Sequence, residues 1–200
     1  MTVHQNKILI LLILLIPGAK YSRAQEFGGG VLCGIAAGQI HGDEKSHFRK
    51  AGAIGGVYVD YKFSEKSRLV IETYYIGKGA VCNEKRSDGT HYQLFKTSLH
   101  YIEFPFLFSY NLLPRFAMAG GPAFSYLIAH RISRYKKIIP PEDYQMNYFD
   151  LQLMAQMDFA LSKKWTTGLR YAYSLTDCRK EPEAAWFNLN LSLVLKYKIK

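Results

Sequence analysis

The chain has 200 residues, a formal net charge of +10, 48% hydrophobic and 14% aromatic residues, and three cysteines. This apolar content excludes a disordered chain, and so few cysteines exclude a small disulfide-rich scaffold. Beyond the N-terminal segment there is no run of about 20 apolar residues, which excludes a multi-helix membrane protein. The 15 tyrosines and 12 phenylalanines favour strands, and aromatic residues gather where a protein meets both lipid and water.

The first segment, residues 1–24, reads as a secretory signal peptide. Lys7 precedes the unbroken apolar run Ile8–Ile16, and the small residues Ser22 and Ala24 predict cleavage before Gln25. This apolar run would span roughly half of a hydrocarbon core as a helix, which argues against a membrane anchor. We expect residues 25–200 to form one exported domain. Export and scattered basic residues also argue against a nucleic-acid partner, despite the positive charge.

From Phe27 onward, apolar residues recur with a period of two, which is typical of strands with two unlike faces. The clearest example is the last segment, where Phe and Leu alternate with Asn, Ser and Lys. The predicted strands, in chain order, are Phe27–Gln39, Ala53–Phe63, Arg68–Lys78, Ser98–Asn111, Phe116–Ala129, Phe149–Leu161, Trp165–Leu175 and Phe187–Ile199.

The connections between these strands are short and long in strict alternation. The short connections are Ser64–Ser67, Leu112–Arg115 and Ser162–Trp165, and the long ones are Ile40–Gly52, Gly79–Thr97, His130–Tyr148 and Thr176–Ala185. Tight turns at one end and longer loops at the other are typical of bacterial outer-membrane barrels. We therefore predict an all-β, eight-stranded antiparallel up-and-down transmembrane β-barrel in the outer membrane, with its turns in the periplasm.

The two faces of the strands decide how such a barrel would be oriented. Lipid offers no partners to backbone groups, so a closed sheet in a membrane presents its apolar face outward. A water-soluble carrier of the lipocalin type would have the reverse orientation and stays open as an alternative. Aromatic residues near the strand ends favour the membrane protein, because they would form two interfacial girdles. The girdle residues are Tyr61, Phe63, Tyr110, Phe116, Trp165 and Tyr197 at the turn border, and Tyr75, Tyr173 and Phe187 at the other.

The polar face of the strands carries an unusual set of charged and amide side chains. An eight-stranded barrel is just wide enough for side chains to fill its interior. We hypothesise a hydrogen-bonded polar plug that stabilises the lumen, and a small-solute channel is the alternative. The expected members are Glu72, Tyr74, Glu103, Gln152, Gln156, Asp158 and Arg170.

Four stretches of the chain resemble the PorT-like outer-membrane β-barrel domain. They are Leu69–Tyr75 with Gly77-Lys78-Gly79 after it, Tyr101-Ile102-Glu103-Phe104-Pro105, Ala119-Gly120-Gly121-Pro122, and Gly168-Leu169-Arg170-Tyr171-Ala172-Tyr173. The resemblance implies an integral outer-membrane protein of a diderm bacterium, and some relatives serve the type IX secretion system. It also implies prolines within strands, at Pro105 and Pro122, where we expect local bulges because proline removes a ladder donor.

An enzyme is a further alternative. Ser98 and His100 lie two residues apart on one predicted strand and so share a face. Some lipid A deacylases use Ser and His on the lipid-facing wall of an eight-stranded barrel, so Ser98 would be the nucleophile and His100 the base. No acidic residue is evident to orient His100, and we expect a structural, interaction or secretion-accessory protein instead of an enzyme.

The predicted long loops carry the remaining candidate features. Cys82 and Cys178 lie in two of them and are candidates for a disulfide in an oxidising compartment. The sequence predicts an outer basic loop that would attract anionic lipid A phosphates or surface glycans, formed by Arg131, Arg134, Lys136 and Lys137. We expect no metal and no cofactor. The expected partners of this monomeric barrel are outer-membrane lipids and envelope or secretion-system proteins.

Overall fold

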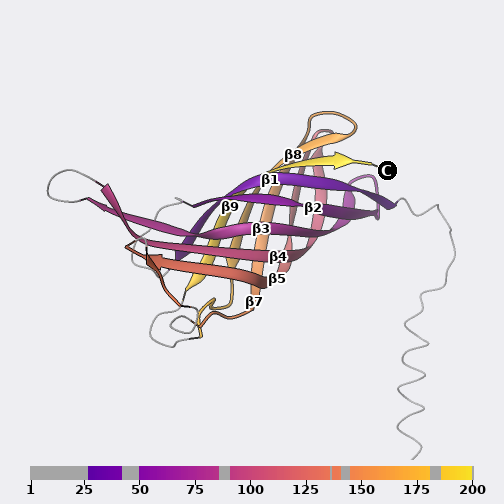
Figure 1. Ribbon diagram of the computed structural model, residues 1–200. Coiled ribbons are helices and arrows are strands. Elements are labelled where there is room, and N and C mark those ends of the chain that lie inside the picture. The colour runs from indigo at the N-terminus through magenta and orange to yellow at the C-terminus, as the bar shows by residue number, and fades with distance from the viewer. Residues whose placement is uncertain are drawn as a thin grey trace, which may run out of the picture.

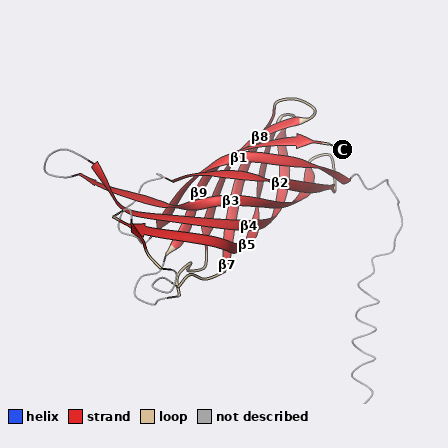
Figure 2. Cartoon of the chain, viewed as in Figure 1, coloured by secondary structure: helices blue, strands red, loops and turns tan. Residues whose placement is uncertain are grey.

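The computed structural model describes residues 27–41, 50–85, 91–135, 137–140, 145–180 and 186–199. The predicted signal peptide, residues 1–24, lies outside the described residues. In the described part, the regular structure consists of strands (Figure 2), and no helix there has the length and apolarity needed to cross a membrane. The strands are β1 (Phe27–His41), β2 (Lys50–Lys62), β3 (Ser67–Lys85), β4 (His91–Leu113), β5 (Phe116–Arg134), β6 (Lys137–Ile138), β7 (Phe149–Ala160), β8 (Trp165–Ser174) and β9 (Phe187–Lys198).

The long strands form a closed ring. Each pairs antiparallel with the next one along the chain, β5 pairs with β7, and β1 pairs with β9 to close the sheet. The two-residue β6 pairs only with the end of β5 and takes no part in the ring. The predicted fold class is confirmed: the protein is an all-β, up-and-down barrel of eight antiparallel strands.

Three neighbouring strands run well past their predicted ends. The β3–β4 ladder continues to the pair Lys85 and His91, and β5 continues to Arg134. Most of Gly79–Thr97 was predicted to be a loop and is strand instead. Figure 1 shows this part of the wall projecting beyond its neighbours, and we call residues 79–85, 91–97 and 130–134 the strand extension. Sequence alternation fails here because a strand outside the membrane need not present an apolar face to lipid.

The bulges expected at the two prolines are also not observed. On either side of Pro105, Ile71 pairs with Phe106 and Tyr74 with Glu103 in an unchanged register. Pro122 stays in register with Leu153 of β7. The register shifts occur elsewhere, at Cys82/Asn83, His100/Tyr101 and Asn111/Leu113. Proline removes one ladder hydrogen bond, but its fixed φ remains compatible with an extended strand, so no residue has to be inserted.

The outer face of the ring is apolar and its interior is polar. Large apolar side chains on every side of the ring are exposed, whereas ionisable and amide side chains are buried inside. This orientation rules out the soluble carrier, which would hide its apolar face. The exposed apolar residues of the wall include Val31, Ile35, Val57, Val59, Phe104, Phe106, Phe108, Met118, Phe124, Leu153, Met157, Leu169, Leu191 and Leu193.

Aromatic side chains make contact near both ends of the barrel. At the end with the short turns, which we call the turn end, the rings of Trp165 and Tyr197 lie 4.8 Å apart. At the opposite end, the loop end, the rings of Tyr173 and Phe187 stack at 6.1 Å. Tyr61 and Phe63 add an edge-to-face pair at the turn end, with ring centroids 4.9 Å apart. These positions are suited to the two borders of a membrane.

Candidate functional site

Inward-facing side chains from four strands form a cluster in the lumen towards the turn end. The carboxylate of Glu72 accepts from Arg170 Nη2 at 2.6 Å and lies 2.9 Å from Lys196 Nζ. Gln156 accepts from Arg170 Nε at 2.6 Å and donates to Asp158 Oδ1 at 2.6 Å. Lys196 Nζ also lies 3.8 Å from Asp158 Oδ2. Two cations thus balance two carboxylates, which we call the turn-side cluster.

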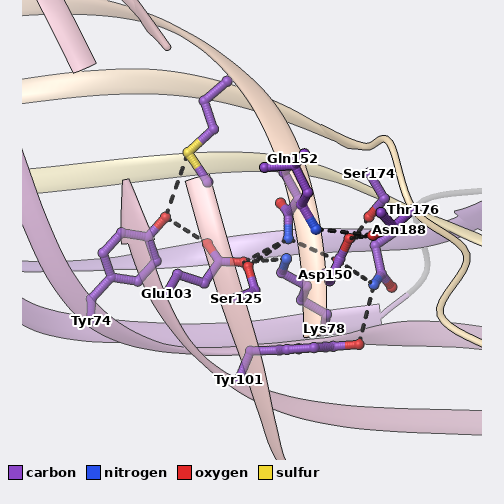
Figure 3. Close-up of polar contacts among 12 residues, drawn as sticks. Tyr74, Lys78, Tyr101, Glu103, Ser125, Asp150, Gln152, Ser174, Thr176 and Asn188 are labelled. Carbon is purple, nitrogen blue, oxygen red and sulfur yellow. Dashed lines mark hydrogen bonds and ion pairs between the residues drawn. The ribbon is translucent and has the colours of Figure 1, made fainter. Parts of the chain in front are cut away.

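A second cluster is centred on the buried carboxylate of Glu103 (Figure 3). Tyr74 donates its hydroxyl proton to Glu103 Oε2 at 2.7 Å, and Lys78 forms an ion pair with Oε1 of the same carboxylate. Ser125 Oγ and Gln152 Nε2 each donate to Glu103 Oε1 at 3.1 Å. Every oxygen of this carboxylate is therefore partnered, which is what burial of a charge requires.

Asp150 extends this cluster towards the loop end. Its carboxylate accepts from Gln152 at 3.0 Å, from Ser174 at 2.8 Å and from Asn188 at 3.0 Å. Thr176 donates to the other oxygen at 3.1 Å. The strands that supply these groups, β7, β8 and β9, are adjacent in the ring. We call the groups around Glu103 and Asp150 the loop-side cluster.

Tyr74 joins the two clusters. Its hydroxyl belongs to the loop-side cluster, while the guanidinium carbon of Arg170 lies 5.1 Å from the centroid of its ring. The lumen is therefore filled by one connected set of polar side chains across the middle of the barrel. Such a set is stable only when nearly all of its members are satisfied, because unpaired polar groups are costly in a low-dielectric interior.

All seven predicted lumen residues face the interior, and six of them are almost completely buried. The exception is Asp158, whose side chain is 14% exposed. The structure adds important partners that the prediction did not include as members of the plug. Lys78, Asp150 and Lys196 occupy the polar positions of alternating segments, so the signal was present in the sequence. The added residues are Lys78, Ser125, Asp150, Ser174, Thr176, Asn188 and Lys196.

The stretches that resemble the PorT-like domain meet inside the barrel. Glu72 from the first stretch pairs with Arg170 from the last, and Lys78 pairs with Glu103. Gly79, which follows Lys78, has a φ of 133°, a left-handed conformation that favours glycine. A Cβ atom there would also clash with the backbone carbonyl of Thr97. The motif residues therefore hold one another in place and the glycine allows β3 to pass close to β4.

At the loop end, two connections contact each other through their described residues 139–140, 145–148, 175–180 and 186, which we call the loop-end cap. Residues Met146 and Arg179 form a β-bridge between them. Asn147 Nδ2 donates to the carbonyl oxygens of Asp177 and Arg179, at 2.9 Å in each case. The carboxylate of Asp177 accepts from the backbone N–H groups of Arg179 at 2.9 Å and Trp186 at 2.8 Å.

An apolar cluster lies beneath the cap. Its members are buried side chains from the wall and from the described residues of both capping connections. They include Leu32, Ile40, Ile54, Ile76, Ala80, Leu99, Leu127, Ile132, Met146, Cys178 and Trp186. The lumen is therefore polar in its middle and apolar towards the loop end.

Cys178 is a buried free thiol in this cluster. Burial, with the nearby carboxylates of Asp150 and Asp177, raises the pKa of the thiol to about 12. The side chain of Cys82 lies outside the described residues, so its pairing with Cys178 stays a prediction.

The candidate catalytic pair is not assembled. His100 Nδ1 lies 2.5 Å from the hydroxyl of Tyr75, and the two rings stack at 5.8 Å. No hydrogen bond joins Ser98 to His100 among the described residues. The Nδ1 atom of the imidazole is instead engaged by an aromatic neighbour on the outer wall, and a catalytic role for Ser98 and His100 stays a prediction.

The predicted basic loop proves to be largely part of the wall. Arg131 and Arg134 lie on β5 within the strand extension, and Lys137 lies on β6. All three side chains are exposed, while Lys136 lies outside the described residues. The charged residues in 130–134 interrupt the alternation of apolar and polar residues, so the sequence predicts a loop there. In the structure the pairing of β5 with β4 continues through this segment. Among the described residues, no group of three His, Cys, Asp or Glu side chains is placed to hold a metal.

Known proteins share this architecture. Ail, the attachment invasion locus protein of Yersinia pestis, is 12% identical, with a TM-score of 0.51 over 87% of this chain and 99% of that one. Neisserial surface protein A (NspA) is 12% identical, with a TM-score of 0.53 over 86% and 97% of the two chains. A structure of Ail in complex with the heparin analogue sucrose octasulfate has 13% identity and a TM-score of 0.53, over 87% and 99%. At these identities the likeness shows the fold alone.

The sequence comparison identifies the family. No curated protein is similar enough in sequence to count as a relative. Residues 23–179, most of the chain, match the model described as outer membrane protein beta-barrel domain. Together with the apolar outer wall of the closed ring, this match shows that the chain is an outer-membrane protein and belongs to the outer membrane protein β-barrel domain family.

Proposed function

We propose that this protein is a non-conducting outer-membrane barrel with a structural or interaction role, and neither a channel nor an enzyme. The observation that carries the proposal is the filled lumen. Charged side chains from opposite walls, such as Glu72 and Arg170, meet at hydrogen-bond distance, and the loop-end cap closes the mouth. A solute path would require these ion pairs to open, at the expense of leaving charges unpaired in the interior.

Within this role we propose a secretion-accessory function like that of the PorT-like relatives. The support is that the stretches carrying the resemblance are the ones that interlock in the lumen, through Glu72 with Arg170 and Lys78 with Glu103. A barrel that does not conduct acts through its surface. The strand extension provides such a surface, because it stands clear of the remaining strands (Figure 1).

The strand extension also favours contact with anionic groups. Arg131 and Arg134 are exposed on β5, and Lys137 follows on β6. The structure of Ail with a heparin analogue shows a barrel of this fold with a sulfated ligand. We propose that these basic residues bind lipid A phosphates or surface glycans by charge attraction.

Planar-bilayer recording of the purified, refolded protein tests the non-conducting role. We expect no stable conductance steps above those of a protein-free bilayer. A Glu72→Ala and Glu103→Ala double variant, if it folds, is the matched control, because it removes the two carboxylates that hold the lumen closed. Large, stable conductance from the unmodified protein would refute the proposal.

The accessory role needs a cellular measurement. A strain that lacks the protein should accumulate secretion cargo in the periplasm, and cross-linking of the intact protein should capture an envelope protein through the strand extension. Unchanged secretion together with no captured envelope protein would refute the secretion-accessory role. Altered lipid A acylation in the same strain, measured by mass spectrometry, would favour the enzyme instead.

A further inference from the structure

The turn end of the barrel contains a pocket of about 710 Å³. It lies between the short turns and the turn-side cluster, on the side that outer-membrane barrels present to the periplasm. Its floor includes Lys196, which is only 6% exposed, and its walls include the inward-facing side chains of Tyr58 and Val70. The cationic lining residues are Arg68, Arg115, Lys163, Lys164, Lys196 and Lys198.

The positive charge of this turn-end pocket exceeds its negative charge. The carboxylates that line it are Asp60 and Asp158. Within the described part of the chain, Lys196 is the lining cation that forms ion pairs, and one of them goes to Glu72 outside the pocket lining. Arg68 donates to the side-chain oxygen of Asn111 at 3.3 Å. The remaining lining cations, which we call the rim cations, have no carboxylate partner among the described residues, so they remain available to an incoming anion. They are Arg115, Lys163, Lys164 and Lys198.

Two of the rim cations, Lys163 and Lys164, lie on a turn whose backbone is held by hydrogen bonds. The hydroxyl of Ser162 accepts from the backbone N–H groups of Lys164 at 3.2 Å and Trp165 at 3.1 Å. The carbonyl of Lys164 accepts from the N–H of Lys198 at 2.8 Å, which joins this turn to β9. A side chain on a backbone fixed in this way loses less conformational freedom when it binds.

We propose that the turn-end pocket binds a small organic anion that carries two or more carboxylate or phosphate groups. The net positive lining supplies the attraction, and lysine and arginine are the side chains that pair with such groups. The volume lies within the range of about 300–1,000 Å³ that is usual for small-molecule sites. The inward-facing side chains of Tyr58 and Val70 would contact a carbon skeleton, which favours an organic anion over a bare inorganic one. The pocket is separate from the strand extension, so this site is independent of the proposed interaction role.

The test is calorimetric titration of the full mature chain, folded in lipid nanodiscs, with citrate, with pyrophosphate and with neutral glycerol. We expect saturable binding of citrate that weakens as salt is added, with weaker binding of pyrophosphate and none of glycerol. Tighter binding of pyrophosphate than of citrate would show that charge alone selects the ligand, and would overturn the assignment to an organic anion.

Variants at the two ends of the barrel locate the site. The double variant Lys163→Gln and Lys164→Gln should weaken binding about five-fold or more, since it removes two exposed rim charges without touching a buried group. The matched control, Lys66→Gln and Lys180→Gln, removes two exposed charges outside the pocket lining and should leave binding unchanged. Equal loss in both variants would show general attraction to a basic protein. That outcome, or the absence of any citrate binding, would overturn the proposal.

Discussion

The two ends of this barrel differ in how far they close the lumen. At the loop end, the described residues of the loop-end cap bond to each other above an apolar cluster that contains Trp186 and Cys178. At the turn end, the short turns leave a pocket lined by cations such as Lys163 and Arg115, which have no carboxylate partner in the described part of the chain. Under the proposed non-conducting role, one capped end and a filled middle are sufficient to block the lumen. The other end can then stay open and charged without creating a channel.

The largest effect on stability is expected in the turn-side cluster, which lies in the lumen between the two ends. Glu72→Ala leaves the cations of Arg170 and Lys196 without their shared carboxylate inside the barrel. Removing one member of a buried ion pair should lower the free energy of unfolding by about 3–5 kcal/mol. Urea unfolding in lipid vesicles measures it. Glu65→Ala, which removes an exposed carboxylate at a turn, is the control and should change stability little. Similar stabilities for the two variants would mean that the lumen charges are not coupled.

A smaller and local effect is expected in the loop-end cap. Asp177→Ala removes the acceptor of the backbone N–H groups of Arg179 and Trp186. Leaving these donors unsatisfied should destabilise the cap by about 1–3 kcal/mol while the ring persists. Hydrogen exchange should therefore speed up at residues 177–180 and 186, and stay slow in β7 and β8. Unchanged exchange in the cap would show that Asp177 does not hold it closed.

The buried thiol beneath the cap provides a pH-dependent test. The pKa of Cys178 is raised to about 12 from an ordinary value of 9.0, so the folded protein keeps the thiol protonated over this interval while the unfolded chain loses the proton. This thiol therefore destabilises the fold progressively as pH rises from about 9 towards 12, with its full contribution retained below 9. Because the thiolate is the reactive form, iodoacetamide should modify folded Cys178 very slowly at pH 8.

Peptide mass spectrometry of the alkylated protein reads out the result. Rapid modification of Cys178 at pH 8 in the folded protein would contradict a sealed cap. The same experiment on the unfolded protein without reductant tests the predicted pairing with Cys82. Three reactive thiols would exclude that disulfide, whereas two protected thiols would establish it.

The smallest effect is expected at the turn end. Arg115 is exposed on the rim of the turn-end pocket among other cations. Arg115→Gln should change the free energy of unfolding by about 0.5 kcal/mol or less, towards greater stability, because it relieves repulsion between like charges. Urea unfolding at low salt should show the gain, and high salt should remove it. A clear loss of stability would mean that this cation is structurally paired, and would weaken the contrast between the two ends.

The sequence predicted the ring well because the membrane imposes a strict pattern on it. Lipid on one face and packed polar groups on the other force alternation, as in β9, where Leu189, Leu191 and Leu193 face outward. That alternation also placed Glu72, Glu103 and Arg170 in the lumen. The pattern weakens at the strand extension, where charged residues such as Lys96 and Arg131 lie on paired strands.

The sequence alone could not predict which side chains meet across the lumen. Alternation says that Glu72 and Arg170 point inward, but their meeting depends on how far the strands are staggered around the ring. The residues are 98 positions apart in the chain. The cap was missed for a related reason. Its bonds, such as those of Asn147 to Asp177, join two irregular connections that have no periodic signal.

Accessibility of the lumen from each end tests the central contrast most directly. Ala117→Cys places a thiol on the wall of the turn-end pocket, and Ala80→Cys places one in the apolar cluster beneath the loop-end cap. Both are Ala to Cys changes in the folded protein, treated in nanodiscs with a negatively charged, membrane-impermeant thiol reagent and followed by peptide mass spectrometry. We predict rapid modification at position 117 and none at position 80 over the same time. Equal modification of both, or faster modification at position 80, would contradict a barrel that is open at its turns and sealed at its loops.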